Sequence, residues 1–361
     1  MAGKRGQRGT HPLSALILEA DPVIVPHRGQ QLLLAALKES HEAARAGSPR
    51  HLVVEGPVGM GKSTVAARYE RTSPAVTMWA GVRAPVVHAR IGSVMRVSTI
   101  VESITAALGD KADQASVAKP VRVGAEWLVR RLEDAGVQLL MLDEIDMRRS
   151  AGHDLENVGA WLSAVASLSH ASLVLLTPQD GLDRHFAVNA GFPTRFASRV
   201  HLEPFAFDPA DTNGINALKK FVGALEDAAG IVVDAGIHEL DILYRLHYSS
   251  GGVIGRLVSL IRGAQLVALE RGSSVVTLAD LYAAHEQGTV EPWLPRLNPF
   301  GSGSAGARSG AGGRTRQAQL VADLPSRVVL ESARREVQKR PQPRDPGQVD
   351  NVGTDEQRAA S

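Results

Sequence analysis

The chain has 361 residues, 44% of them hydrophobic, and a formal net charge of +2 at pH 7. This length suits one large domain or two modest ones with a tail, and any contact with nucleic acid must come from local basic patches. The absence of cysteine excludes disulfides, thiolate zinc sites and thiol catalysis, and is typical of a cytoplasmic protein. No apolar run approaches about eighteen residues, and the basic N-terminus lacks a signal-peptide core, so we expect no contact with a membrane.

The first two parts of the chain are an arm and an α/β domain. Residues 1–20 are expected to form a flexible basic arm that leads into a short helix. In residues 21–205, strand-like and helical segments alternate, which predicts a parallel sheet flanked by helices. The expected strands are 52–55, 86–91, 137–142, 172–177 and 200–203, and the expected helices are 30–46, 62–70, 98–108, 123–135 and 155–168.

The strand signal ends after the α/β domain. Residues 206–288 have the apolar spacing of helices, which predicts a small α-helical lid. The expected lid helices are Ile215–Ala228, Ala235–His247, Val253–Arg271 and Leu278–His285. Residues 289–361 are expected to be mostly disordered, because Gly, Ser, Arg, Gln and Pro dominate them. The peptide 292–300, with a Trp and an Asn-Pro-Phe ending, is the exception.

A P-loop pattern begins at Gly56, where the sequence is Gly-Pro-Val-Gly-Met-Gly-Lys-Ser. Its glycines allow a backbone nest whose N–H groups point at phosphate oxygens, Lys62 can reach the β- and γ-phosphates, and Ser63 can bind Mg²⁺. A Gly-rich turn without function does not explain the strand before the loop and the helix after it. The sequence thus predicts an ATP and Mg²⁺ site formed by Gly56, Pro57, Val58, Gly59, Met60, Gly61, Lys62, Ser63 and Thr64.

A second motif is the apolar run from Val137 that ends in Asp143 and Glu144. Acids at the carboxyl end of a buried parallel strand lie where α/β sheets bind ligands. Asp143 can bind the Mg²⁺ directly or through water, and Glu144 can orient or deprotonate the attacking water. The alternative is that the two acids only cap the start of a helix.

An α/β nucleotide domain followed by a helical lid resembles the layout of AAA+ ATPases. By this resemblance Thr177, at the end of a strand, is sensor 1, which contacts the γ-phosphate and the attacking water. Arg256, in the first turns of a helix after a Gly-rich turn, is sensor 2. Arg199 is the arginine finger that enters the neighbouring subunit's site, with Arg195 in reserve. Each residue also has an ordinary interpretation, as a strand-ending Thr or as a surface Arg.

The segment before the first helix resembles the one that packs against adenine in initiator-type AAA+ ATPases. Within it, Val25 to Arg28 could touch the base, so Val25 and Arg28 are the candidate contacts.

The order of motifs between Asp143 and Arg199 resembles the TniB family and its relatives TnsC and MuB, which select target DNA for transposases. The resemblance covers roughly residues 23–300. The chain departs from the family pattern in Leu175-Leu176-Thr177, in the run Ser198-Arg199-Val200, and in Ile145-Asp146, where the family commonly has a His. Residues 292–300 resemble the family's C-terminal peptide.

The resemblance implies an ATPase that assembles on duplex DNA as a ring or filament and recruits a DDE transposase and a target-selection protein. A grip on DNA phosphates without base readout needs Lys, Arg and hydroxyl groups. The candidates, each of which is also an ordinary surface residue, are Arg90, Arg96, Ser98, Lys111, Lys119 and Arg122. Two alternatives stay open. One is a replication initiator or helicase loader. The other is a nucleotide-gated scaffold or adaptor with little turnover, and Glu144 argues against this second alternative because the chain thereby retains a catalytic acid.

Overall fold

The structure is a computed structural model that describes ten stretches of the chain. They are residues 27–78, 81–92, 94–109, 121–149, 153–183, 191–208, 212–229, 232–233, 240–288 and 298–301. The chain separates into two units at residues 301 and 302, and the second unit lies wholly outside the described residues. The predicted arm, Val25, Lys111, Lys119 and most of the predicted tail also lie outside them.

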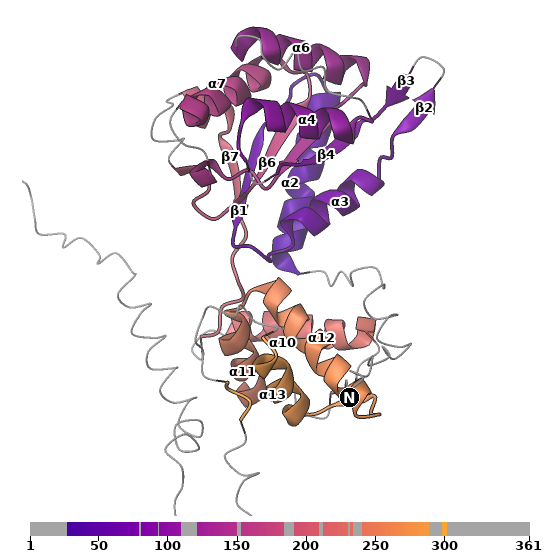
Figure 1. Ribbon diagram of the computed structural model, residues 1–361, viewed down its shortest axis with the longest axis vertical. Coiled ribbons are helices and arrows are strands. Elements are labelled where there is room, and N and C mark those ends of the chain that lie inside the picture. Colours follow the sequence, from indigo (N-terminus) through magenta and orange to yellow (C-terminus); the bar gives the residue numbers. More distant parts are fainter. Residues whose placement is uncertain are drawn as a thin grey trace, which may run out of the picture. The chain divides into compact units, whose positions relative to one another are not determined.

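A five-stranded parallel sheet forms the centre of the α/β part (Figure 1). Its order is β4-β5-β6-β1-β7, with β1 at Leu52–Gly56, β4 at Val86–Arg90, β5 at Leu139–Asp143, β6 at Ser172–Pro178 and β7 at Ser198–His201. Every residue of β1 and β5 is buried, because helices cover both faces of a parallel sheet. The predicted α/β fold is confirmed, although the last strand begins and ends two residues earlier than the predicted 200–203.

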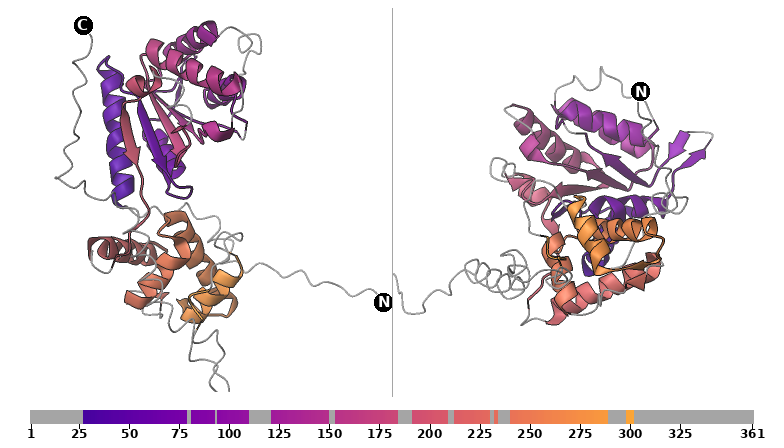
Figure 2. Two further views of the ribbon diagram at one scale, coloured as in Figure 1. Left: turned by 90° about the vertical axis from the view of Figure 1, so that its left-hand side faces the viewer. Right: turned by 60° about the horizontal axis from the view of Figure 1, so that its bottom comes forward.

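Helices pack on both faces of this sheet, as the left view of Figure 2 shows. On one face, α2 (Arg28–Arg45) and α3 (Lys62–Arg71) bury Leu33, Leu37 and Val65. The other face is covered by α4 (Val97–Ala107), α6 (Val121–Asp134), α7 (His153–Leu168) and the short α9 (Gly191–Arg195). The five predicted helices of this domain are present, with ends within two residues of those expected.

The lid consists mainly of α10 (Thr212–Ala229), α11 (Leu240–Ser250), α12 (Ile254–Glu270) and α13 (Leu278–Glu286). The predicted α-helical lid is present, and it contains one pair of short strands that was not predicted: β8 (Val232–Val233) pairs in parallel with β9 (Val275–Val276). Two-residue strands have too little pattern to be recognised in a sequence. The Asn-Pro-Phe ending contacts this lid, because Asn298 donates to the Tyr282 carbonyl and Phe300 is buried.

A small antiparallel hairpin precedes β4 and has no counterpart among the predicted elements. It pairs β2 (Val76–Met78) with β3 (Gly81–Arg83). Each strand has only three residues, and the intervening Trp79-Ala80 is not a usual hairpin-turn pair, so the sequence carried little signal.

Among the described residues, no single helix is long and apolar enough to cross a membrane. Only α11 and α12 taken together reach that length and composition, and they are bent by 113° where they meet.

The buried strand β5 provides a test of the core. Leu140 is 0% exposed in β5, whereas Leu32 on α2 is 49% exposed. We expect Leu140→Ala to lower the free energy of unfolding by about 2–5 kcal/mol, through lost burial and a residual cavity. The control Leu32→Ala should cost less than about 1 kcal/mol. Chemical denaturation measures both, and equal losses would contradict the assigned core.

Candidate nucleotide-binding site

The P-loop connects the end of β1 to the start of α3. Gly59 and Gly61 have φ angles of 89° and 81°, in the left-handed region that glycine adopts without strain. Gly61 is the residue immediately before α3, so the N–H groups of the first helical turn open toward the loop. The local sequence therefore forms an anion cradle by backbone geometry alone.

Lys62 is the first residue of α3, and its side chain folds back over the loop. Its Nζ donates to the carbonyl oxygens of Gly56 at 2.5 Å and Pro57 at 3.0 Å. Burial lowers the pKa of Lys62 to about 8, although the nearby charge of Asp143 acts in the opposite direction. A phosphate would replace these carbonyl contacts and favour the charged ammonium.

Asp143 is the last residue of β5, and its side chain is only 2% exposed. It accepts hydrogen bonds from His88 at 3.1 Å, from the backbone N–H of Glu144 at 2.9 Å, and from the Ser63 hydroxyl. Burial raises the pKa of Asp143, but the hydrogen bonds from His88 and Ser63 outweigh it and leave the pKa below its usual value. His88 on β4 was not singled out from the sequence, since only strand pairing places it beside Asp143.

The fit to Mg²⁺ depends on oxygen donors. The Ser63 hydroxyl and the Asp143 carboxylate contact each other and line the same cavity, which suits a hard cation. Within the described part of the chain, no cluster of three or more His, Cys, Asp or Glu residues could bind a metal without further ligands. A Mg²⁺ ion here would therefore need phosphate oxygens and water in addition to Ser63 and Asp143.

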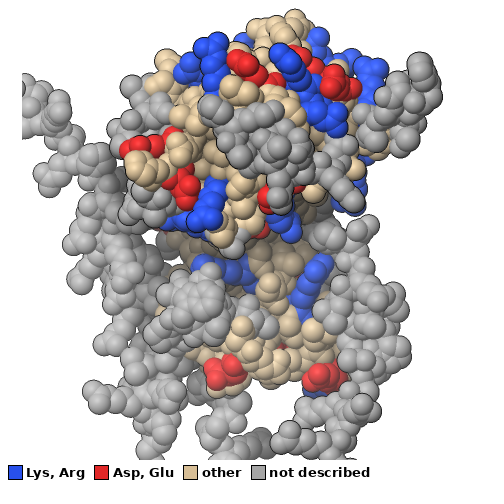
Figure 3. Space-filling model, turned by 45° about the horizontal axis from the view of Figure 1, so that its top comes forward, with Lys and Arg blue, Asp and Glu red and all other residues tan. Residues whose placement is uncertain are grey.

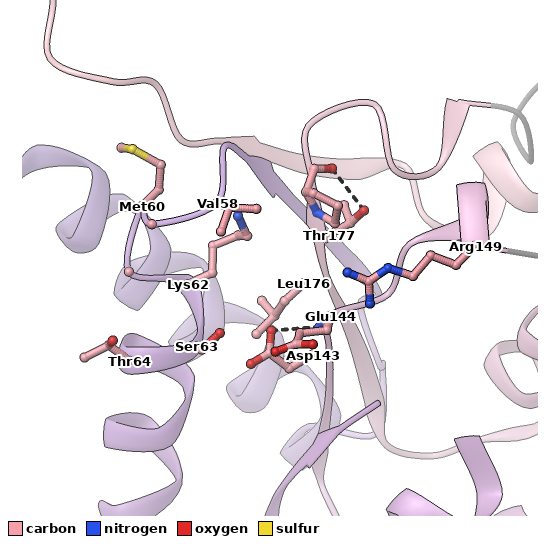
Figure 4. A pocket seen from close by; sticks show the side chains of 13 residues that line it. Val58, Met60, Lys62, Ser63, Thr64, Asp143, Glu144, Arg149, Leu176 and Thr177 are labelled. Carbon is pink, nitrogen blue, oxygen red and sulfur yellow. Dashed lines mark hydrogen bonds between the residues drawn. The ribbon is translucent and has the colours of Figure 1, made fainter. Parts of the chain in front are cut away.

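Glu144 and Thr177 complete the side of the cavity opposite the loop (Figure 4). Glu144 has a φ of 63° and a side chain that is 46% exposed, 3.8 Å from Nε of Arg90. Thr177, near the end of β6, is fully buried and donates to the Pro178 carbonyl at 3.1 Å. An exposed carboxylate and a buried hydroxyl, at neighbouring strand ends, thus line the cavity across from the loop.

These residues line one cavity of about 320 Å³. The residues around it are Val58, Gly59, Met60, Gly61, Lys62, Ser63, Thr64, Asp143, Glu144, Arg149, Leu176, Thr177 and Pro178. The predicted loop, both acids and the sensor threonine are thus brought together. Gly56 and Pro57 contribute through the carbonyl groups that bond Lys62.

The candidate arginine fingers lie away from this cavity. Arg199 is exposed and lies within β7, paired with Val53, rather than just before the strand as predicted. Arg195 donates to the Ser167 hydroxyl and, at 2.9 Å, to the Gly191 carbonyl. Arg195 is thereby bonded within its own chain, and the position of Arg199 on β7 leaves its role as a finger a prediction.

The start of α12 contacts the P-loop, but Arg256 does not line the cavity. The N–H of Gly255 donates to the Gly59 carbonyl at 2.8 Å. Arg256 follows in the first turn of α12 and is half-buried. The predicted sensor 2 residue therefore lies one position from a residue that contacts the loop, and its contact with phosphate stays a prediction.

Of the two predicted adenine contacts, only Arg28 lies among the described residues, and it is not brought inward. Arg28 is exposed at the start of α2, and Val25 lies outside the described residues. Instead His27 is buried against Phe205 and Phe221, with ring centroids 6.0 Å from each. Burial lowers the pKa of His27 to about 4, so this ring is neutral at pH 7.

The candidate DNA contacts are distributed among acidic side chains. Arg96 pairs with Asp154 at 3.1 Å, and Arg122 pairs with Glu126 at 3.2 Å. Figure 3 shows Lys and Arg interspersed with Asp and Glu on the face that it presents. Isolated ion pairs of this kind are typical of a solvated surface, so the DNA contacts stay a prediction.

Arg149 is the charged cavity residue that sequence reasoning missed, besides Leu176 and Pro178. It lies in a single 3₁₀ turn, η1 (Met147–Arg149), shortly after β5. Its position just beyond the carboxyl end of an acid-terminated strand was the signal that could have identified it.

Solved structures share this fold at low sequence identity. An ORC2 protein from Aeropyrum pernix, in ADPNP and ADP complexes, matches with a TM-score of 0.52 and 15% identity, covering 75% of this chain and 70% of that one. An ORC1 protein from Aeropyrum pernix in complex with DNA matches with a TM-score of 0.51 and 18% identity, covering 75% of this chain and 68% of that one. Cdc6p from Pyrobaculum aerophilum matches with a TM-score of 0.51 and 12% identity, covering 75% of this chain and 70% of that one. No curated protein matches the sequence.

The sheet, the P-loop and these likenesses define the fold as that of an AAA+ ATPase, the class predicted from the sequence. The family model described as "Bacterial TniB protein" matches residues 17–203, which is more than half of the chain. The chain therefore belongs to the TniB family, as its motif order predicted.

The lowered pKa of Lys62 predicts a pH-dependent affinity for nucleotide. Phosphate binds the charged ammonium, so above a pKa of about 8 binding must be accompanied by proton uptake. We expect the affinity for ADP to fall as pH rises through this value, by at most about tenfold per pH unit. Calorimetry at pH 9 in buffers of different ionisation enthalpy should detect the proton.

The control for this prediction is Lys62→Ala. Binding should be much weaker in this variant, and the residual affinity should be flat across the same pH range. An equally steep pH dependence without Lys62 would assign the effect to another group.

Proposed function

We propose that this protein hydrolyses ATP to control its assembly on duplex DNA, and that the assembly recruits a DDE transposase and a target-selection protein. The observation that carries the proposal is the meeting of Lys62, Glu144 and Thr177 around one cavity in a member of the TniB family. The ADPNP and ADP complexes of the ORC2 protein, and the DNA complex of the ORC1 protein, are consistent with it at the level of fold.

In the proposed reaction the P-loop N–H groups and Lys62 bind the phosphates of ATP, and Ser63 and Asp143 bind Mg²⁺. The metal would neutralise charge that develops on the phosphate oxygens. Glu144 orients a water and accepts its proton as the water oxygen attacks the γ-phosphorus. The bond from that phosphorus to the β,γ-bridging oxygen breaks, and ADP and phosphate leave. Thr177 would orient the γ-phosphate through its hydroxyl group.

Assembly would follow from contacts that require the γ-phosphate. Arg199 of one subunit would enter the site of the next, and Arg256 would approach the phosphates from the lid. These contacts are lost after hydrolysis, so the affinity between subunits differs between the ATP and ADP states. The DNA contacts would be made to phosphates and would not depend on base sequence.

The transposase and target-selection partners rest on family membership. A gene for a DDE transposase beside the gene for this chain would support this part of the proposal. A neighbourhood of replication genes without a transposase would favour the initiator or helicase-loader alternative.

The role of Glu144 is tested with Glu144→Gln. Loss of a general base should lower ATP turnover by about 10²–10⁴-fold while nucleotide binding is retained. The matched control is Glu156→Gln, because Glu156 is an exposed acid on α7 that does not line the cavity. Phosphate release with and without DNA measures turnover. Unchanged turnover in Glu144→Gln would contradict this role, and negligible turnover in the natural protein would support the scaffold alternative.

The role of Arg199 in the neighbouring site is tested by mixing two inactive variants. Arg199→Ala has an intact Glu144, and Glu144→Gln has an intact Arg199. If the finger acts between subunits, each variant alone should be inactive, and the mixture with DNA should recover part of the turnover. The control is Arg131→Ala, on α6 outside the cavity, which should keep its activity.

An inactive mixture would show that Arg199 does not act across the interface. Electron microscopy with duplex DNA and a non-hydrolysable ATP analogue then tests assembly itself, and monomers at saturating nucleotide would contradict the assembly proposal.

A further inference from the structure

Arg149 lies at the cavity but belongs to none of the motifs that explain the site. It ends η1, and it lines the cavity together with the P-loop and the two acids. In Figure 4 its side chain extends into the cavity from the side opposite Lys62, toward Thr177 and Glu144. A guanidinium group in this position faces the place where the terminal phosphate of a bound nucleotide would lie.

The backbone between β5 and Arg149 is anchored to β6, which bears Thr177, and to the turn that follows β6. The N–H of Ile145 donates to the Leu176 carbonyl at 3.1 Å, and the N–H of Met147 donates to the Gly181 carbonyl at 2.8 Å. The N–H of Arg149 then closes the turn on the Asp146 carbonyl at 3.0 Å. These three bonds fix the start of the Arg149 side chain relative to Thr177, so its reach into the cavity is set by the fold.

Asp146 lies close enough to orient Arg149, but it leaves most of the N–H donors of Arg149 available. Its carboxylate is 8% exposed and is bonded by Arg148 through Nε at 2.8 Å and Nη2 at 3.0 Å. Nε of Arg149 lies farther away, at 3.5 Å. Because Arg148 already neutralises Asp146 through two hydrogen bonds, Arg149 keeps most of its five N–H donors for another anion.

The charges around the cavity favour a ligand with a terminal phosphate. Asp143 and Glu144 contribute negative charge, and Lys62 contributes positive charge from the loop side only. Arg149 adds a planar fork on the far side, a geometry that matches phosphate oxygens in a bidentate manner. A diphosphate bound in the loop would contact Lys62, whereas a triphosphate would extend toward Arg149.

We propose that Arg149 binds the terminal phosphate of ATP within its own subunit, opposite Lys62, and that a single subunit thereby distinguishes ATP from ADP before it meets a neighbour. This inference rests on the proposed nucleotide site and adds a residue to it. Arg149 provides selectivity in the free subunit, and Arg199 acts only after assembly.

The test compares two ligands and three variants without DNA, at concentrations at which the protein is monomeric. Calorimetry measures the affinities for ADP and for a non-hydrolysable ATP analogue. Arg149→Ala should lower the affinity for the analogue by about tenfold or more, as expected for the loss of a hydrogen bond to a charged group. Its affinity for ADP should change by less than about twofold. Arg149→Lys should restore part of the loss.

The matched control is Arg131→Ala. Arg131 lies on α6 outside the cavity, and its side chain is 39% exposed, compared with 41% for Arg149. This variant should bind both ligands as the natural protein does. Thermal unfolding of all variants separates a loss of contact from a loss of fold.

The outcomes separate this inference from the proposed function. Equal affinities of Arg149→Ala and the natural protein, or equal losses for ADP and the analogue, would overturn the role of Arg149 and leave the nucleotide site intact. A loss seen only with assembled protein on DNA would place Arg149 at the interface and also overturn the inference. A natural protein that binds neither ligand would overturn both.

Discussion

Parallel pairing of β1 with β6 and of β6 with β5 is the constraint on which the site depends. Gly56 is paired with Pro178 and Leu142 with Leu175, so these strands end at one edge of the sheet. Because the strands run in the same direction, the loop after β1, the acids after β5 and the threonine near the end of β6 meet there. Residues more than one hundred positions apart thereby line a single cavity.

The cavity balances acids against cations across this edge. Asp143 is kept ionised by hydrogen bonds from His88 and Ser63, and Lys62 is partly destabilised as a cation by burial. In the proposed reaction, a bound phosphate would satisfy Lys62 and the metal would satisfy Asp143. Perturbed groups in a cavity are a common property of functional sites, and here they coincide with the P-loop motif.

The P-loop and the lid are connected by a backbone hydrogen bond and by a close side-chain contact. Gly255 donates to the Gly59 carbonyl, and a Cβ on Gly255 would lie 3.0 Å from that oxygen. Val253 is equally close to the place that a Cβ on Gly59 would occupy, at 3.0 Å. A change in the conformation of the P-loop would therefore alter its contacts with the start of α12. This contact joins the P-loop to the lid, on which the Asn-Pro-Phe ending also packs.

Much of the fold could be predicted because its signals are local. The strands of the sheet and the longer helices have clear apolar periodicity, and the P-loop and the acid-terminated strand are recognisable from residue type and spacing. The hairpin β2–β3, the pair β8–β9 and the short α9 could not be predicted, because segments of two to five residues carry too little pattern. Their existence depends on what packs beside them.

For this protein, the sequence by itself determined the class of fold, the loop that cradles phosphate, and the acids and threonine that face it, because each depends on a short segment and on strand direction. The tertiary structure alone decided which other side chains reach them. It placed His88 on Asp143 through strand pairing, brought His27 rather than Arg28 inward through packing on two phenylalanines, and directed Arg149 into the cavity through a turn anchored to β6. The physical reason is that such contacts join segments distant in the chain, whose relative position is fixed only when the sheet and its helices pack together.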